Sequence, residues 1–416
     1  MFAVIIWEKR VFRFELRCMR YLSTIYSILS YASRTIRLFS GHEPGRSLSI
    51  QSVRGAIPRR VLGQTIHLLG TVSGDGIWEL THRESLRDVV VCLNAQRDKL
   101  YHLGFRAPVT RSTLAYANEH RDWRIYRDLA QVLIGKARSL YANDAAFNLD
   151  LDGTVYVLDS TTIDLCLNVF TWATFRTTKA AVKLHTLMDL KGNIPAFFDI
   201  SNGHEHDVHF LDRIHYEVGA YYVMDRGYVD YARWYAIHQA QAFFVTRAKG
   251  NLACKRLYSN KVDKTIGVRC DQVIRLTGYQ AAQDYPDTLR RVKYVDAQTD
   301  KSYVFFTNDF NVAARTIAEL YKHRWQIELF FKWIKGHLKI KAFWGHSSNA
   351  VKTQICIAIS TYLIVAIMRK QLLVDRNLYE ILQILGVSLF DTTPMNTLVS
   401  EFDLHCIDER IQKLPF

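Results

Sequence analysis

The segment Tyr321–Gly345, YKHRWQIELFFKWIKGHLKIKAFWG, carries a single carboxylate, Glu328, among basic and aromatic side chains. Tyr321, Arg324, Glu328 and Lys335 follow one another at steps of three, four and seven residues, so a helix places all four on one face. A solvated stripe of i,i+4 ion pairs is the alternative, but the neighbouring aromatic residues disfavour it. The other face of this helix is expected to pack on a core through Phe330, Trp333, Ile334 and Leu338.

Two further acids end apolar runs that are typical of buried strands. Asp159 ends VYVLD and Asp225 ends YYVMD. A polar residue at the carboxyl end of a buried strand lies where α/β sheets bind ligands. Burying an unpaired carboxylate is costly, so each acid is expected to have a cation partner. A turn-forming or helix-capping Asp is the structural alternative for each.

Asp159, Asp225 and Glu328 together offer an all-oxygen ligand set for two Mg²⁺ ions, with Mn²⁺ as an alternative. Two such ions activate an attacking oxygen and stabilise a leaving oxygen during phosphodiester displacement. The basic residues Arg324 and Lys335 would then hold phosphates. Two aromatic residues, Tyr321 and Trp325, are candidates for contact with a displaced base. Three basic residues are candidates for contact with phosphate: Lys179, Lys183 and Arg247. For these three, simple solvent exposure is the alternative.

The hydrophobic periodicity divides the chain into regions. Residues 79–145 predict helices, and one short helix led by Arg111 after a turn resembles a helix-turn-helix, with an ordinary helical bundle as the alternative. Residues 150–345 alternate strands and helices, with strands dominating 242–307 and helices over 311–339 that break near Lys322. Helices return in 346–416. The fold class is therefore α/β, preceded by a helical N-terminal domain.

The composition favours a polyanionic partner. The formal charge is +14, from 54 Lys and Arg against 40 Asp and Glu, and nucleic acid is the commonest polyanion; a generally basic protein is the alternative. Seven widely spread Cys without a CxxC argue against a disulfide framework or a zinc ribbon and favour a reducing cytoplasm. The segment HEHDVH (204–209) lacks the spacing of known zinc motifs. The apolar run 355–368 is shorter than the ~20 residues of a membrane span and predicts a buried helix, so no membrane association is expected.

On these residues the chain resembles the DDE transposases of bacterial insertion-sequence family four, which includes the transposon-five transposase. Tyr321, Arg324, Glu328 and Lys335 meet the family signature Y-(2)-R-(3)-E-(6)-K in full. VLDSTTI resembles its first-Asp motif, and VMDRGYVDY its second. The resemblance covers about residues 79–400, and the gap between Asp225 and Glu328 matches the β-rich insertion that the family places there.

The resemblance implies an RNase H-like catalytic core over 150–345 and cut-and-paste transposition through a hairpin intermediate. It also implies that residues 79–145 bind terminal inverted repeats, that the partners are these repeats and target DNA, and that a homodimer holds two ends in a synaptic complex. The expected location is the nucleoid. The family often has a His-Asp pair at His206 and Asp207, which would support the site or cap a helix.

Residues 1–78 do not resemble the family's N-terminus. The resemblance starts abruptly at ELTHRESLRD, where family members tend to have a stretch similar to CWDQ…AMAF just before it. We therefore expect a frameshift upstream of about Glu79. Two alternatives to an active transposase stay open: an inactive DNA-binding remnant, which the N-terminus favours, and an RNase H-like nuclease without strand transfer. The intact acids favour catalysis, and the Tyr, Arg and Lys of the signature favour a transposase over a nuclease.

Overall fold

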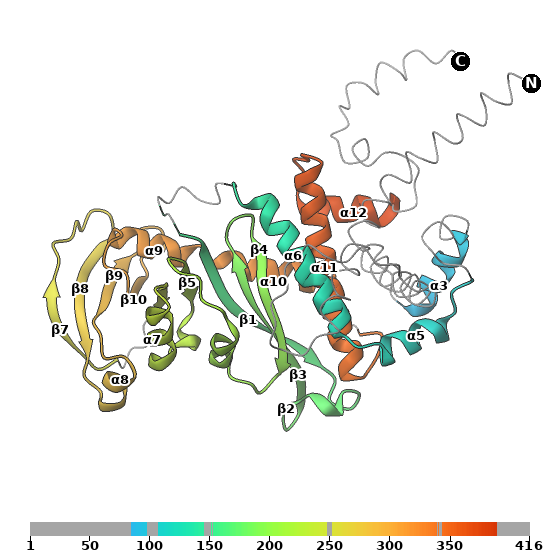
Figure 1. Cartoon of the computed structure of the whole chain (residues 1–416), viewed down its shortest axis with the longest axis horizontal. Helices are drawn as coiled ribbons and strands as arrows, with labels where there is room; N and C mark the ends of the chain where they lie inside the picture. The colour runs from blue at the N-terminus through green and yellow to red at the C-terminus, as the bar shows by residue number, and fades with distance from the viewer. Residues whose placement is uncertain are drawn as a thin grey trace, which may run out of the picture.

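A computed structural model describes residues 85–97, 107–144, 151, 153–247, 252–338, 340 and 343–388. The basic segment 1–78 and its predicted frameshift lie outside these residues, as do residues 389–416. The described chain is built on one long mixed sheet, with helices on both faces (Figure 1). The α/β class predicted from the sequence is thereby confirmed.

The sheet has the strand order β2-β3-β1-β5-β6-β10-β9-β8-β7, and β4 also pairs with β3. The strands β4, β3 and β1 are antiparallel, whereas β1, β5 and β6 run parallel to one another. From β6 onward every pairing is antiparallel. The strand bounds are β1 Val155–Leu165, β2 Thr174–Arg176, β3 Lys179–Asp189, β4 Ile194–Asn202, β5 Tyr221–Met224, β6 Phe243–Arg247, β7 Cys254–Ser259, β8 Val268–Leu276, β9 Leu289–Val295 and β10 Ser302–Thr307.

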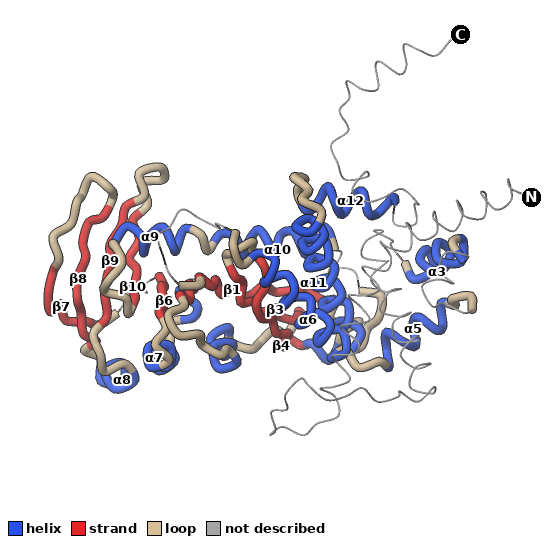
Figure 2. The backbone as a smooth tube through the Cα atoms, turned by 45° about the horizontal axis from the view of Figure 1, so that its top comes forward, coloured by secondary structure: helices blue, strands red, loops and turns tan. Residues whose placement is uncertain are grey.

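The strands predicted between 242 and 307 all form, but they do not make a separate sheet. β10 pairs with β6, so β7 to β10 extend the central sheet toward one end of the molecule (Figure 2). A buried ion pair braces this extension: Arg290 donates to Asp271 at 2.9 Å and also to the carbonyl of Val312, which precedes the next helix.

The turn between β3 and β4 shows how local sequence fixes a hairpin. Gly192 has φ 71° and Asn193 has φ 55°. Positive φ values of this kind are adopted most readily by glycine and asparagine. A Cβ on Gly192 would also lie 2.2 Å from the Tyr141 ring. Glycine is therefore needed here for both backbone and space, and the KGN turn predicted from the sequence is confirmed.

Helices cover each face of the sheet. On one face a large core joins the sheet to α6, α9, α10, α11 and α12; on the other, a smaller core joins it to α7 and the 3-10 segment η2. α3 and α5 lie beyond one end of the sheet around a small core of their own (Figure 1). The bounds are α3 Leu86–Ala95, α5 Arg111–His120, α6 Arg124–Tyr141, η2 Asp207–Arg213, η3 Arg226–Tyr228, α7 Tyr231–Gln239, α8 Tyr279–Asp284, α9 Ala314–Lys322, α10 Trp325–His337, α11 Ser348–Gln371 and α12 Leu378–Ser388, with a 3-10 turn η1 at Thr171–Ala173.

α11 is apolar on all sides, which is typical of a helix enclosed by protein. It spans 24 residues, longer than the run 355–368 suggested, and among the described residues it alone is long and apolar enough to cross a membrane. Within its most apolar window, 89% of the residues are buried inside the protein. The prediction of a buried helix is therefore confirmed, whereas the length argument for it was wrong.

Candidate active site

Asp159 and Asp225 lie on neighbouring parallel strands at matching positions. The last parallel pair between β1 and β5 is Leu158 with Met224, and each acid is the next residue in its strand or turn. β1 continues past Asp159 to Leu165, and this second half pairs with β3. The parallel register therefore brings the two carboxylates together on one face.

The turn after β5 fixes the position of Asp225. Its side chain caps η3 by accepting a hydrogen bond of 2.6 Å from the amide of Gly227. A Cβ on Gly227 would lie only 2.8 Å from that same carboxylate oxygen. The glycine therefore lets the backbone approach the acid. The Thr246 hydroxyl of β6 donates to the carbonyl of Asp225 at 3.1 Å. The backbone at Asp225 is therefore held by β6 as well as by β5, which it follows in the chain.

Glu328 reaches the same place from the helical layer. It lies in the first turn of α10, which begins after the predicted break between α9 and α10. Arg324 precedes α10 and joins the acids: its Nη1 donates to Asp159 at 2.8 Å and its Nη2 donates to Glu328. The Tyr321 ring packs beneath the guanidinium, with 5.8 Å between the ring centroid and Cζ. The cation partner expected for a buried Asp is therefore Arg324.

The cluster of acids favours added positive charge. The pKa of the Asp159 carboxyl is raised to about 6, chiefly by burial and also by the nearby charges of Asp225 and Glu328, against the opposing effects of Arg324 and the Ser160 amide. The charges of Asp225 and Glu328 therefore act on the ionisation of Asp159. Among the described residues no three His, Cys, Asp or Glu side chains are gathered as a ready metal site. The donor set itself, three carboxylates with one of raised pKa, fits a hard divalent cation.

The other residues of this helical segment divide between docking and exposure. Lys335 donates to the carbonyl of Thr162 at 2.7 Å and so docks α10 on β1. Trp325 is 58% exposed beside Arg324, which leaves its ring available to a ligand. Tyr321 is partly buried against Phe305 of β10. Arg324 and Lys335 are thus directed at β1, whereas Tyr321 belongs to α9, so the four residues do not share one continuous helix face as predicted.

The remaining candidate DNA contacts are spread more widely. Lys179 is exposed at the start of β3, and the guanidinium of Arg247 lies 5.1 Å from the Tyr303 ring centroid. The Lys183 side chain is only 14% exposed and donates to Asp207 at 3.0 Å, so its ammonium is engaged within the protein. Arg111 is exposed as the first residue of α5, which lies beyond the far end of the sheet from β7 (Figure 1).

Ser160 was not among the predicted site residues, and its contact with Asp207 was not foreseen. Ser160 donates its amide to Asp159 at 2.8 Å and its hydroxyl to Asp207 at 2.7 Å. Asp207 belongs to the HEHDVH segment, and its only sequence signal was the His-Asp pair that the resemblance supplied. The contact joins positions 47 residues apart, which the pattern of either segment alone does not predict.

Comparisons with known proteins identify the family of this chain. The family described as Transposase DDE domain matches residues 150–364, and a domain of unknown function (DUF4372) matches residues 77–106. A protein of Sinorhizobium fredii that is named as a transposase, y4zB, is 34% identical over 258 residues, which are 61% of this chain and 70% of that protein.

Two relatives carry the names of insertion sequences. The transposase named for element IS5377 of Geobacillus stearothermophilus is 30% identical, over 50% of this chain and 55% of its own length. The one named for IS4SA of Synechocystis is 23% identical, over 62% and 71%. A cryo-EM structure of the piggyBac transposase synaptic complex with hairpin DNA covers 94% of this chain and 83% of its own at 10% identity, with a TM-score of 0.41, too low to support an argument.

The match of the family spans more than half of the chain and contains Asp159, Asp225 and Glu328. The resemblance to DDE transposases of insertion sequences is thereby confirmed. This chain belongs to the transposase DDE domain family of insertion-sequence transposases.

Proposed function

We propose that this protein is a DNA transposase that moves an insertion sequence by a cut-and-paste route. Water would nick the element end, the freed 3′-hydroxyl would attack the opposite strand to form a hairpin, and the resolved end would join target DNA. The observation that carries the proposal is the meeting of Asp159 and Asp225 at matching positions of β1 and β5, with Glu328 joined to Asp159 through Arg324.

An RNase H-like core is the fold that we propose for the catalytic region. It is supported by five strands in the order β4-β3-β1-β5-β6, of which the first three are antiparallel and the last three parallel. Asp159 on the central strand and Asp225 after its parallel neighbour fit such a core, and β7 to β10 fit a β-rich insertion.

Asp159, Asp225 and Glu328 would hold two Mg²⁺ ions, with Mn²⁺ as an alternative. When bound, such ions would activate the oxygen that attacks the phosphorus and stabilise the charge on the oxygen that leaves it. The raised pKa of Asp159 supports this assignment. A bound cation stabilises the ionised form of such a buried group of carboxylates.

The residues around the acids would bind and distort the DNA. Arg324 can make a two-pronged contact to a phosphate because its guanidinium presents parallel N–H donors. Trp325 is exposed enough to stack on an unpaired base, which hairpin formation requires. Tyr321 holds Arg324 from beneath, and Lys335 fixes α10 against β1.

The proposed partners are the terminal inverted repeats and target DNA, in keeping with the charge of +14. We assign the inverted repeats to the helical region 79–145, where Arg111 begins α5. Synapsis of two ends calls for a homodimer, and the place of action would be the nucleoid in the cytoplasm.

A DNA-binding remnant is the second candidate. The earlier of the two family matches begins at residue 77, close to the frameshift predicted upstream of Glu79. If residues 1–78 replace a native DNA-binding segment, the catalytic region would be intact while end recognition would be impaired. Reading the gene in all frames tests this, because a frameshift predicts an uninterrupted family-like stretch in another frame.

A cleavage assay separates these functions. The purified protein is incubated with a duplex that carries the element's terminal inverted repeat, with and without Mg²⁺, and the products are resolved on a denaturing gel. Mg²⁺-dependent nicks and hairpins are expected from a transposase. Nicks without hairpins or strand transfer would indicate a plain nuclease, and binding without cutting, or no binding at all, would indicate a remnant.

A further inference from the structure

The segment HEHDVH (204–209) has no part in the proposed chemistry, yet it contacts the strand that carries Asp159. Among the described residues it does not form a metal cluster. Instead Asp207, the first residue of η2, faces the sheet from the side opposite to α10, where the smaller core lies. The role of this half-buried acid follows from the residues that it contacts.

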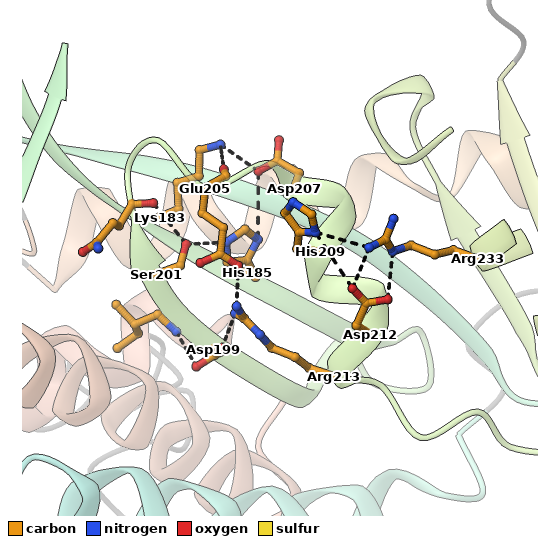
Figure 3. A network of polar contacts seen from close by, with 12 residues as sticks. Lys183, His185, Asp199, Ser201, Glu205, Asp207, His209, Asp212, Arg213 and Arg233 are labelled. Atoms are coloured by element: carbon orange, nitrogen blue, oxygen red, sulfur yellow. Dashed lines mark hydrogen bonds and ion pairs between the residues drawn. The ribbon is translucent and has the colours of Figure 1, made fainter. Parts of the chain in front are cut away.

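Asp207 accepts two hydrogen bonds on one carboxylate oxygen. Lys183 of β3 donates to it at 3.0 Å and donates also to the carbonyl of Glu205 at 2.7 Å (Figure 3). The hydroxyl of Ser160 donates to the same oxygen of Asp207 at 2.7 Å. The Lys183 side chain is only 14% exposed, so its ammonium is largely shielded from water. Such shielding strengthens the hydrogen bonds and holds their geometry.

Ser160 connects this ion pair to the catalytic face. Successive residues of a strand point to opposite faces, so the Ser160 hydroxyl points toward Asp207 while Asp159 points toward α10. The Ser160 amide also donates to the Asp159 carboxylate at 2.8 Å. Fixing the Ser160 side chain from behind therefore fixes the donor that orients Asp159 in front.

A second contact links Asp225 to the segment that carries Asp207. η2 packs against η3, the turn that Asp225 caps. Tyr228 of η3 is 1% exposed and lies within the fields of Asp159, Asp207 and Asp225. Burial keeps the pKa of its hydroxyl well above the ordinary value. The hydroxyl therefore stays protonated and adds no further negative charge beside the acids.

We propose that Asp207 is a positioning residue for the catalytic carboxylates, held in place by Lys183 and acting through Ser160 on Asp159. This inference rests on the proposed function, since it takes Asp159 as a metal ligand. It assigns Lys183 to the support of the site and away from direct contact with DNA phosphate. Partners behind metal ligands commonly contribute about 10–100-fold to metal affinity or activity.

Three single variants, one of them a control, test the inference. Asp207→Asn removes the charge but keeps the shape, and Ser160→Ala removes only the hydroxyl and leaves the Lys183 pair intact. Asp212→Asn is the matched control, because Asp212 lies in the same 3-10 segment and also forms an ion pair, at 2.7 Å with Arg233 (Figure 3), but its partners Arg233 and His209 lie on α7 and η2 rather than on β1.

Three readouts are measured for each variant: Mn²⁺ affinity without DNA by electron paramagnetic resonance, nicking as a function of Mg²⁺, and DNA affinity. Asp207→Asn and Ser160→Ala are expected to weaken Mn²⁺ binding and to lower nicking about 10–100-fold, with unchanged DNA affinity. The double variant should be no worse than the more severely affected single variant, since both changes break one path. Asp212→Asn should behave as the unmodified protein does.

Wild-type Mn²⁺ affinity in both single variants would overturn the proposal. So would a loss in Asp207→Asn that Ser160→Ala does not share, because Asp207 would then act only on the fold. If Asp207→Asn does not fold, the Mn²⁺ affinity of Ser160→Ala decides whether Asp207 positions Asp159 or acts only on the fold. If the unmodified protein binds Mn²⁺ but never nicks DNA, the proposed function fails, while the comparison of Mn²⁺ affinities still tests the positioning role.

Discussion

Arg324 and Asp159 are 165 positions apart in the chain and are joined by a hydrogen-bonded ion pair of 2.8 Å. The same guanidinium also reaches Glu328, one helical turn further along α10. One cation thus ties the helix that carries the third acid to the strand that carries the first.

Glu328→Ala should abolish nicking while leaving DNA binding intact, because the residue is assigned to the metal and not to phosphate. A bound metal contributes several kcal/mol to transition-state stabilisation, and at about 1.4 kcal/mol per factor of ten this corresponds to roughly a thousandfold loss. The control is Glu319→Ala in α9, whose carboxylate pairs with Arg315 at 2.7 Å on the surface. Normal cleavage by Glu328→Ala would refute the assignment of the site.

Arg324→Ala should destabilise the protein, because it leaves Asp159 and Glu328 without their shared cation. Breaking a buried ion pair costs ~3–5 kcal/mol, and we expect about 3 kcal/mol because Glu328 is partly solvated. Urea denaturation measures the change, with Arg315→Ala as a control that should leave stability unchanged. Arg324→Lys should not restore it, since one ammonium cannot reproduce the two-pronged contact. Wild-type stability in Arg324→Ala would show that the bridge contributes nothing.

Divalent-metal affinity should rise with pH and level off above about 6, the value to which burial raises the pKa of Asp159. Below that pH the metal must displace a proton from the carboxyl. Affinity should therefore fall by up to about tenfold for each pH unit below the pKa, since one proton is released per site. Calorimetric titration with Mn²⁺ checks this. Asp159→Asn should bind more weakly and lose most of the pH dependence; an equally steep dependence in that variant would assign the titration elsewhere.

Trp325→Ala should separate nicking from hairpin formation. The side chain is 58% exposed, so its removal should not change stability. Stacking of a base on an aromatic ring contributes ~1–3 kcal/mol, which predicts a roughly 5–150-fold loss of hairpin product with nicking retained. Trp325→Phe should recover part of the loss. A variant that nicks and forms hairpins at the wild-type ratio would remove Trp325 from the DNA-distorting set.

Several features of this fold could be predicted because they are local. The spacing of Glu328 and Lys335 places both on one face of α10, and the break before α10 was placed correctly near Lys322, which leaves Tyr321 in α9. The KGN turn required only Gly and Asn at positions of positive φ. The partners of β1, which are β3 and β5, could not be predicted, because strand pairing is not encoded in the strand itself.

The sequence by itself determined which residues carry the proposed chemistry: three acids, two of them after apolar runs, and a basic aromatic helix. Only the tertiary structure decided how they meet. The parallel register of β1 and β5 brings Asp159 beside Asp225, Arg324 pairs with two of the acids, and Lys183 is engaged by Asp207. Such contacts join segments far apart in the chain, and they form only when the sheet and its covering helices pack together. Packing buries the charged groups, and a buried charge is stable only when a group of opposite charge lies beside it.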